Sequence, residues 1–529
     1  MNLSQAGGCM VLAIFLSRIL GLVRDATISY RFGLAADRDA YVAAFALPDL
    51  LYFLIAGGAL SSALIPVFTR YFSEGESDEA WKVFSSIACI LGVVVSLFVV
   101  VTWVFANPIV AFLTPGMHPE TQQLAGSLAR ILLPSQIAFF MGGLIFGTMY
   151  AQRHYTTPAM APNIYNVGII CGAIFIAPLM TPMIFGPAWG ALVGAIVGNL
   201  IIPLLSLKQF GAKFQIRFDF AHPGVKRVFR LMLPVVFGLS LPAVYAMVIR
   251  YYGSNFEEGS ISALDVGNRI MQAPLGIFGQ SLAVAVFPVL SAFHAQSQTK
   301  QFLATMSKTA RTATFIGLIV SALMITLAPD IVRVLNQYGK FTNINTVYVS
   351  HCVAMYGIGV FAWCAHPILT RAFFAIEDAI TPVILGTIST IAFLIVCSWI
   401  YRAGYGYESL ALAVSISAIL LFALLMLGIR WKLGRADGLA MLKLLLVAGI
   451  LAAAVGGLVY AAGQLFPAPT GKRALLLSAG RLLLLGGGGL AIYLLLARLL
   501  RLREADYILA SFKGRHEATT APASDESTP

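Results

Sequence analysis

Long apolar runs alternate with short polar stretches along most of the chain. A bilayer core about 30 Å thick needs about 20 apolar residues per helix, and about fourteen segments meet that requirement. The pattern therefore predicts an all-α polytopic membrane protein. The expected helices lie near residues 6–26, 38–70, 83–107, 123–150, 158–181, 186–207, 229–252, 262–293, 311–337, 347–374, 380–401, 408–430, 440–463 and 474–500.

Composition strengthens this interpretation. Hydrophobic residues make up 59% of the chain and charged residues only 11%, whereas soluble globular domains carry roughly a quarter charged residues. That shortfall excludes an ordinary soluble enzyme. The 48 glycines and 24 prolines are typical of membrane helices, in which neighbouring helices satisfy the broken backbone bonds.

The net charge of +12 could indicate nucleic-acid binding, but in a membrane protein it is better explained by positive cytoplasmic loops. With the N-terminus placed in the cytoplasm, loop lysines and arginines divide about 22 to 7 in favour of the cytoplasmic side. We therefore expect a multi-pass membrane protein with both termini cytoplasmic. We expect no nucleic-acid partner.

Three sequence matches at nearly one offset indicate an internal repeat. FANPIVAFL (105–113) resembles LAPDIVRVL (327–335), GALSSALIPVF (58–68) resembles QSLAVAVFPVL (280–290), and YAQRHYTTP (150–158) resembles FAIEDAITP (374–382). A repeat of six helices preserves direction, so the copies are parallel, as in many transporters with a cavity at the midplane. A duplicated scaffold without transport is the alternative.

The repeat divides the chain into five predicted parts. These are an N-lobe of six helices (1–207), a cytoplasmic linker (208–225), a C-lobe of six helices (226–430), a C-terminal helix pair (431–502) and a disordered cytoplasmic tail (503–529).

Several charges fall inside apolar segments, where each costs roughly 2.5–3.5 kcal/mol on insertion scales and therefore faces a cavity or a partner. Arg18, Arg24 and Asp25 lie in the first helix, Asp39 opens the second, and Arg269 lies in the eighth. Arginine binds phosphate oxygens in a bidentate manner and keeps its proton, so these positions indicate a cationic cavity for an anionic substrate. Snorkelling to the interface and intramembrane salt bridges remain the alternatives.

Prolines and glycines in two helices mark candidate hinges. They are Pro48, Gly57 and Gly58 in the second helix, and Pro274 and Gly276 in the eighth. Close packing through small residues explains them equally well. The chain has no Walker A motif, no nucleophile elbow and no HExxH, so we expect neither an enzyme nor a cofactor or metal site.

Taken in order, several motifs resemble the MurJ (MviN-like) lipid II flippase family of the MOP flippase superfamily. They are SRILGLVRD (17–25), LPDLL (47–51), GALSSALIPVF (58–68), TPGM (114–117), TPAMAPNIYN (157–166), NRIMQAPLGIFG (268–279), QYGKFT (337–342) and RAFFAIEDAITP (371–382). The resemblance covers about residues 5–500.

The resemblance implies fourteen helices around a cationic cavity that moves lipid II, an undecaprenyl-diphosphate-linked disaccharide-pentapeptide, from the inner to the outer leaflet. It implies substrate-binding roles for Arg18, Arg24, Asp25, Asp39 and Arg269, with the last helix pair lining a groove for the lipid tail. Membrane lipids are further partners. Ion coupling is compatible with this mechanism, although no site for a coupling ion is legible.

The chain also departs from the family pattern. Many members carry an arginine and a glutamate in the second helix where this chain has Tyr52 and Gly57, and Gln272 follows Arg269 in place of an acid. We assign Tyr52 to the substrate site, where its hydroxyl could donate to phosphate or its ring could stack on sugar. The alternatives are an ion-coupled exporter of drugs or other lipid-linked polysaccharides, and a non-transporting scaffold for cell-wall synthesis.

Overall fold

The structure is a computed structural model that describes residues 3–52, 59–207, 209, 211–434, 438–466 and 474–512. Every regular element in this part is helical. The α-helices are α1 Leu3–Phe32, α2 Ala36–Ala44, α3 Ala46–Leu51, α4 Ala59–Ser73, α5 Ser77–Val104, α6 Ala106–Leu113, α7 Pro119–Leu132, α8 Ser135–Ala151, α9 Thr156–Cys171, α10 Phe185–Ile196, α11 Ile202–Leu207, α12 Pro223–Gly253, α13 Ser260–Pro274, α14 Ser281–Ala295, α15 Thr299–Thr326, α16 Ala328–Asn336, α17 Asn343–Gly357, α18 Val360–Ala375, α19 Ile380–Arg402, α20 Glu408–Leu433, α21 Gly438–Leu465, α22 Ala474–Leu499 and α23 Arg503–Phe512.

Ten spans among the described residues are long and apolar enough to cross a bilayer, or eleven if the bent pair α17 and α18 forms one span. The predicted all-α polytopic membrane fold is therefore confirmed. The expected total of fourteen is not confirmed by these spans. Short π-helical turns, η2 (Gly172–Ile176), η4 (Val197–Ile201) and η6 (Leu275–Gln280), interrupt three of the spans.

The segment expected as one long helix over 38–70 is broken. Its described parts are α2, α3 and α4, and α2 gives way to α3 at Phe45. Pro48 explains this break, because it has no N–H to donate to the carbonyl of Ala44, four residues earlier, and its ring clashes with that carbonyl in a continuous helix. The candidate hinges Gly57 and Gly58 lie outside the described residues.

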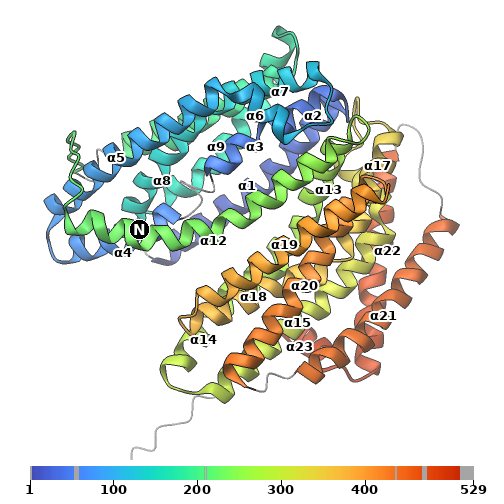
Figure 1. The fold of residues 1–529 in the computed structure, drawn as a ribbon. Coiled ribbons are helices and arrows are strands. Elements are labelled where there is room, and N and C mark those ends of the chain that lie inside the picture. The colour runs from blue at the N-terminus through green and yellow to red at the C-terminus, as the bar shows by residue number, and fades with distance from the viewer. Residues whose placement is uncertain are drawn as a thin grey trace, which may run out of the picture. The chain divides into compact units, whose positions relative to one another are not determined.

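Contacts group the chain into two compact units. The first comprises Met1–Arg269, Val332–Cys352 and Gly386–Val414. Within it α1 packs on α9, α9 on α10, α4 on α8 and α12, and α2 on α7 (Figure 1). This grouping follows contacts rather than the repeat, so the lobe boundaries at 207 and 226 stay predictions.

The second unit comprises Ile270–Ile331, Val353–Leu385 and Ser415–Pro529. Helix α15 packs against α18 and α21, and α21 against α22 (Figure 1). Residues 503–512 belong to the tail predicted to be disordered, but they form α23. The carboxylate of Glu504 is buried against the guanidinium of Arg311 on α15. Ala505 and Ile508 pack on the apolar core of the second unit, and such packing stabilises a short helix.

Two pairs of turns repeat in local geometry. Arg153 and Glu377 both have positive φ, 61° and 59°, and in each turn the next residue donates its N–H to the carbonyl five residues before it. Gly75 and Ser297 repeat this arrangement with φ of 79° and 56°. Each is the left-handed turn that commonly ends a helix. Helices α5 and α15, which follow the second pair, both have 28 residues.

Candidate functional site

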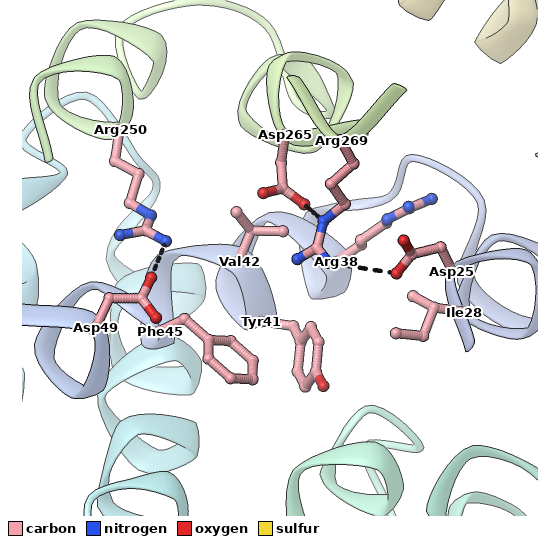
Figure 2. Close-up of a pocket in the computed structure, with 10 residues that line it drawn as sticks. All are labelled: Asp25, Ile28, Arg38, Tyr41, Val42, Phe45, Asp49, Arg250, Asp265 and Arg269. Atoms are coloured by element: carbon pink, nitrogen blue, oxygen red, sulfur yellow. Dashed lines mark hydrogen bonds and ion pairs between the residues drawn. The ribbon is translucent and has the colours of Figure 1, made fainter. Parts of the chain in front are cut away.

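Charged side chains line an open cavity of about 100 Å³ within the first unit. Figure 2 shows the ten lining residues, which come from α1, α2, α3, α12 and α13. They are Asp25, Ile28, Arg38, Tyr41, Val42, Phe45, Asp49, Arg250, Asp265 and Arg269. The lining therefore joins charges from both predicted halves of the sequence.

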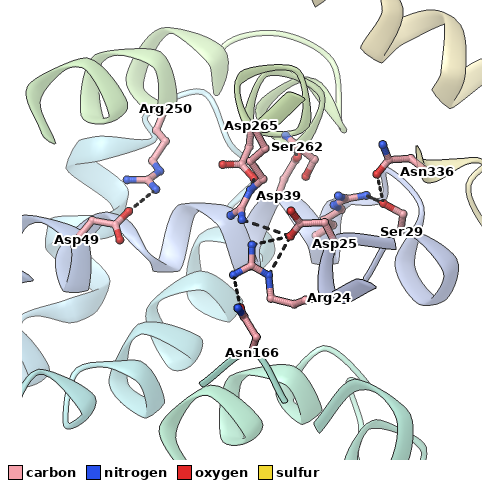
Figure 3. A network of polar contacts seen from close by, with 12 residues as sticks. Arg24, Asp25, Ser29, Asp39, Asp49, Asn166, Arg250, Ser262, Asp265 and Asn336 are labelled. Atoms are coloured by element: carbon pink, nitrogen blue, oxygen red, sulfur yellow. Dashed lines mark hydrogen bonds and ion pairs between the residues drawn. The ribbon is translucent and has the colours of Figure 1, made fainter. Parts of the chain in front are cut away.

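Asp25 is the centre of a bridged group of charges at this cavity (Figure 3). Its Oδ1 accepts from Arg24 Nε at 2.9 Å and Nη2 at 2.8 Å, and from Arg269 Nη1 at 3.3 Å. Arg269 Nε also donates to Asp265 Oδ2 at 2.7 Å, and Arg24 Nη1 donates to Asn166 Oδ1 at 3.1 Å. The structure thus brings together three residues that the sequence assigned to the site: Arg24, Asp25 and Arg269.

Local helix geometry explains these positions. Asp265 and Arg269 are four residues apart on α13, so their side chains share one helix face. On α9, Asn166 and Asn163 donate their side-chain amides to the carbonyls of Ser17 and Ala13. These bonds hold α1 against α9 and so fix the direction in which Arg24 leaves α1.

A second ion pair lies in the same cavity. Arg250 Nη2 on α12 donates to Asp49 Oδ2 on α3 at 2.8 Å. The Arg250 side chain is only 8% exposed, while that of Asp49 is 38% exposed. Sequence analysis assigned neither residue to the site, because nothing in the sequence pairs residues 201 positions apart.

Arg38 is buried and holds the end of α1. Its Nη1 donates to Gly33 O at 2.7 Å and to Ser29 Oγ at 3.2 Å. Ser29 Oγ in turn donates to Asn336 Oδ1 at 2.9 Å. This chain of bonds joins α1 and α2 to the end of α16, and sequence analysis missed both Ser29 and Asn336.

Asp39 does not line the cavity. It is 5% exposed, and its two carboxylate oxygens accept from the backbone N–H groups of Gly259 at 2.6 Å and Ser262 at 2.8 Å. These amides lie at the start of α13, where a helix leaves its first N–H groups without partners of its own. Asp39 therefore docks α2 onto the beginning of α13.

The remaining predicted substrate residues lie elsewhere. Arg18 is exposed on α1 and forms no hydrogen bond or ion pair recorded within the described residues. Tyr52 is partly exposed and makes an edge contact with Phe139, which does the same with Tyr165. Neither Arg18 nor Tyr52 lines the cavity of Figure 2.

The candidate hinges differ in setting. Pro48 is buried inside α3. In the second unit, Pro274 ends α13 and Gly276 lies in the π-helical turn η6 that follows. A change of helix type at this point places two candidate hinge residues at an irregular part of the backbone, as kinks in helices generally require.

The lining carries as many negative as positive charges. It has three aspartates and three arginines, so the expected excess of positive charge is not present among the lining residues in this conformation. Two of these arginines form ion pairs with aspartates of the same cavity: Arg269 pairs with Asp25, and Arg250 pairs with Asp49. The arrangement can present guanidinium groups to an anion once these carboxylates are displaced.

Comparisons with known proteins agree on one family. A profile of the lipid II flippase MurJ family matches residues 28–477. The lipid II flippase MurJ of Burkholderia cenocepacia is 28% identical over 428 residues, which cover 78% of this chain and 81% of the relative. A probable lipid II flippase MurJ of Vibrio cholerae is 29% identical over 440 residues, covering 81% and 83%.

Solved structures place the fold in the same group. A lipid II flippase MurJ in an inward closed conformation superposes with a TM-score of 0.75 at 25% identity, over 93% of this chain and 99% of that one. An inward-facing multidrug resistance MATE transporter of the MOP superfamily has a TM-score of 0.67 at 16% identity over 82% and 99%, which shows the fold alone. Since the family profile spans far more than half of the sequence, this chain belongs to the lipid II flippase MurJ family.

Proposed function

We propose that this protein moves lipid II across the membrane by alternating access, using the charged cavity bordered by α1, α2, α12 and α13. The observation that carries the proposal is the group Arg24, Asp25 and Arg269, in which charges from both sequence halves meet. A diphosphate headgroup cannot enter hydrocarbon without a large desolvation cost, and a polar path lined by arginine reduces that cost.

The proposed roles follow from the geometry. Arg24 and Arg269 bind the diphosphate, and Asp25 holds both guanidinium groups in place when the site is empty. Arg18, exposed on the same helix, receives the headgroup, and the Tyr52 ring packs on its sugars. Asp39 positions α13 and does not touch the substrate, since its oxygens are occupied by backbone amides.

The movement is proposed to use Pro48, Pro274 and Gly276, together with Gly57 and Gly58, as hinges. The six-helix lobes 1–207 and 226–430 would then change their relation around the site, while α21 and α22 hold the polyprenyl tail. The excess of lysine and arginine in one set of loops supports cytoplasmic termini in the bacterial inner membrane. On this reading the substrate moves from the inner to the outer leaflet.

The test uses cells depleted of their own lipid II flippase and supplied with this chain. Arg24→Ala and Arg269→Ala should each fail to restore growth and surface exposure of lipid II, and precursor should accumulate inside. Arg402→Ala is the matched control, because Arg402 is exposed at the end of α19, outside the cavity. This control should restore both readouts.

The other outcomes separate the alternatives. Restored growth and normal lipid II exposure with Arg24→Ala and Arg269→Ala would contradict the arginine mechanism. Failure of the unaltered chain to restore lipid II exposure, despite normal membrane levels, would favour an exporter of a different substrate.

A further inference from the structure

The segment between α11 and α12 presents a row of apolar side chains with no partner in the described part of the protein. Residues 212–219 carry no helix. Phe214, Ile216, Phe218 and Phe220 are 57%, 83%, 55% and 64% exposed. In an extended stretch of chain, alternate side chains point to the same face. These four side chains therefore form a continuous apolar row, which we call the apolar edge.

Hydrogen bonds and a surface ion pair connect the same segment to α5. Ser85 Oγ accepts from Gln215 N at 3.1 Å and donates to Lys213 O at 3.5 Å, and the Lys213 ammonium pairs with Asp78 at 2.6 Å. At the far end, Asp219 accepts from the backbone amides of Ala221 and His222 just before α12. The exposure of the apolar edge is therefore built in and is not that of a detached loop.

The position of Ser85 along α5 locates the segment relative to the bilayer. At 1.5 Å per residue, the 28 residues of α5 extend about 42 Å, which exceeds the roughly 30 Å hydrocarbon core. The charges of α5 all lie at its start, in Asp78, Glu79 and Lys82, and Val83–Val104 is free of charged side chains. Ser85 therefore lies near the point where α5 enters the hydrocarbon.

Two neighbours of the segment extend this surface. Leu204 and Leu205, ten and nine residues before Phe214, are exposed at the end of α11 and belong to the apolar surface of a membrane span. On the other side, Lys226, Arg227 and Arg230 are exposed on the first turns of α12. Apolar side chains beside exposed cations match the boundary between acyl chains and anionic headgroups.

We propose that residues 214–220 form a membrane-interface anchor. Phe214, Ile216, Phe218 and Phe220 insert into the boundary of the leaflet that the loop charges assign to the cytoplasm, and the α12 cations bind anionic lipid headgroups. The connection between the two predicted lobes is thereby held at the bilayer surface. This inference requires only that the protein spans a bilayer, so it is independent of the substrate.

The experiment measures the depth of a fluorescent label. Ile216→Cys in an otherwise cysteine-free chain is labelled with the environment-sensitive dye NBD, and the full chain is reconstituted in phosphatidylglycerol and phosphatidylcholine vesicles. Glu76→Cys is the control, because Glu76 is exposed in the turn before α5, on the same side of the membrane but farther from Ser85 along the helix. Phe218→Cys provides a second position on the apolar edge.

The label at positions 216 and 218 should show blue-shifted emission and several-fold stronger quenching by lipids brominated near the headgroup than the label at position 76. Quenching at position 216 should weaken when bromine is placed deeper in the acyl chain. Water-like emission and no bromolipid quenching at both edge positions, in chains that elute as the folded protein, would overturn the proposal. Protection of these positions only when another protein is added would instead indicate a protein-docking edge.

Discussion

The contact of Asp39 with the start of α13 allows a quantitative test of how the site is held together. Ser262 is the third residue of α13, so its N–H has no acceptor within its own helix. Asp39 supplies that acceptor and binds Gly259 N–H with its second oxygen. Asp39→Asn keeps the size of the side chain but removes the charge and replaces one accepting oxygen by a donating NH₂ group.

The expected cost follows from the two bonds. A hydrogen bond to a charged group contributes about 1.5–3 kcal/mol. Asparagine loses one such bond, at about 1.5–3 kcal/mol, and reduces the other to a neutral one, at a further cost of about 1–1.5 kcal/mol, so docking of α13 should weaken by about 2.5–4.5 kcal/mol. At about 1.4 kcal/mol per factor of ten, local opening should become about 60- to 1,600-fold more frequent.

Hydrogen–deuterium exchange of the peptide around residues 254–266 measures this opening directly. Asp37→Asn is the control, since it removes the same charge from the same first turn of α2 and Asp37 has no hydrogen bond recorded within the described residues. Exchange in this peptide should accelerate by the stated factor in Asp39→Asn alone. Equal exchange in the two variants would refute the docking role of Asp39.

Three further outcomes are expected. Gly259→Ala should destabilise the protein more than Gly75→Ala, because both have positive φ but only at Gly259 would a new Cβ lie 2.6 Å from a carbonyl oxygen; melting temperatures compare them. Asp49→Asn should lower stability by about 1–3 kcal/mol because it leaves the buried guanidinium of Arg250 unpaired, and adding Arg250→Met should recover part of the loss in the same melting assay. Burial alone would raise the pKa of Asp378. Hydrogen bonds from the Thr381 side chain and backbone N–H, together with the nearby Lys432 ammonium, outweigh burial and lower this pKa to about 2. The ionised carboxylate stabilises the fold above about pH 4, so melting temperature should fall as pH drops from 4 to 2 in the unaltered chain, and this extra fall should be absent in Asp378→Asn.

The general architecture was accessible from sequence because bilayer thickness imposes a length on every apolar helix. The fold class could therefore be predicted, and the repeated turns at Arg153 and Glu377 occur in the two segments that sequence comparison had paired. The break at Phe45 was predicted only in part. Sequence analysis marked Pro48 as a hinge inside one long helix, whereas Pro48 divides that helix by leaving the carbonyl of Ala44 without a helical donor.

Part of the candidate site could also be predicted from the sequence, again because of the constraint that the bilayer imposes. A charge in an apolar segment needs compensation, which singled out Arg24, Asp25 and Arg269 individually. Their pairing was not predictable, since Asp25 and Arg269 are 244 residues apart. Asn166 belonged to a motif that supported the family resemblance, but its amide gave no signal of the bond it forms with Arg24.

The linker illustrates a different limit. Sequence analysis predicted that residues 208–225 form a cytoplasmic linker between the lobes, and it did not consider the alternation of Phe214, Ile216, Phe218 and Phe220. The alternation became informative only in the structure, where the backbone of the segment bonds to Ser85 and the four apolar side chains remain exposed.

In the mechanism proposed above, the shared carboxylate of Asp25 makes substrate capture an exchange of counter-ions. An anion that engages Arg24 or Arg269 displaces a tethered competitor, so its affinity is the difference between two interactions rather than the full strength of either. When the anion leaves, the carboxylate returns from within bonding distance and acts as a local reagent at very high effective concentration. A site of this kind therefore releases its substrate readily. When it is empty, its charges compensate one another, so it carries no net charge while the protein returns to its starting conformation.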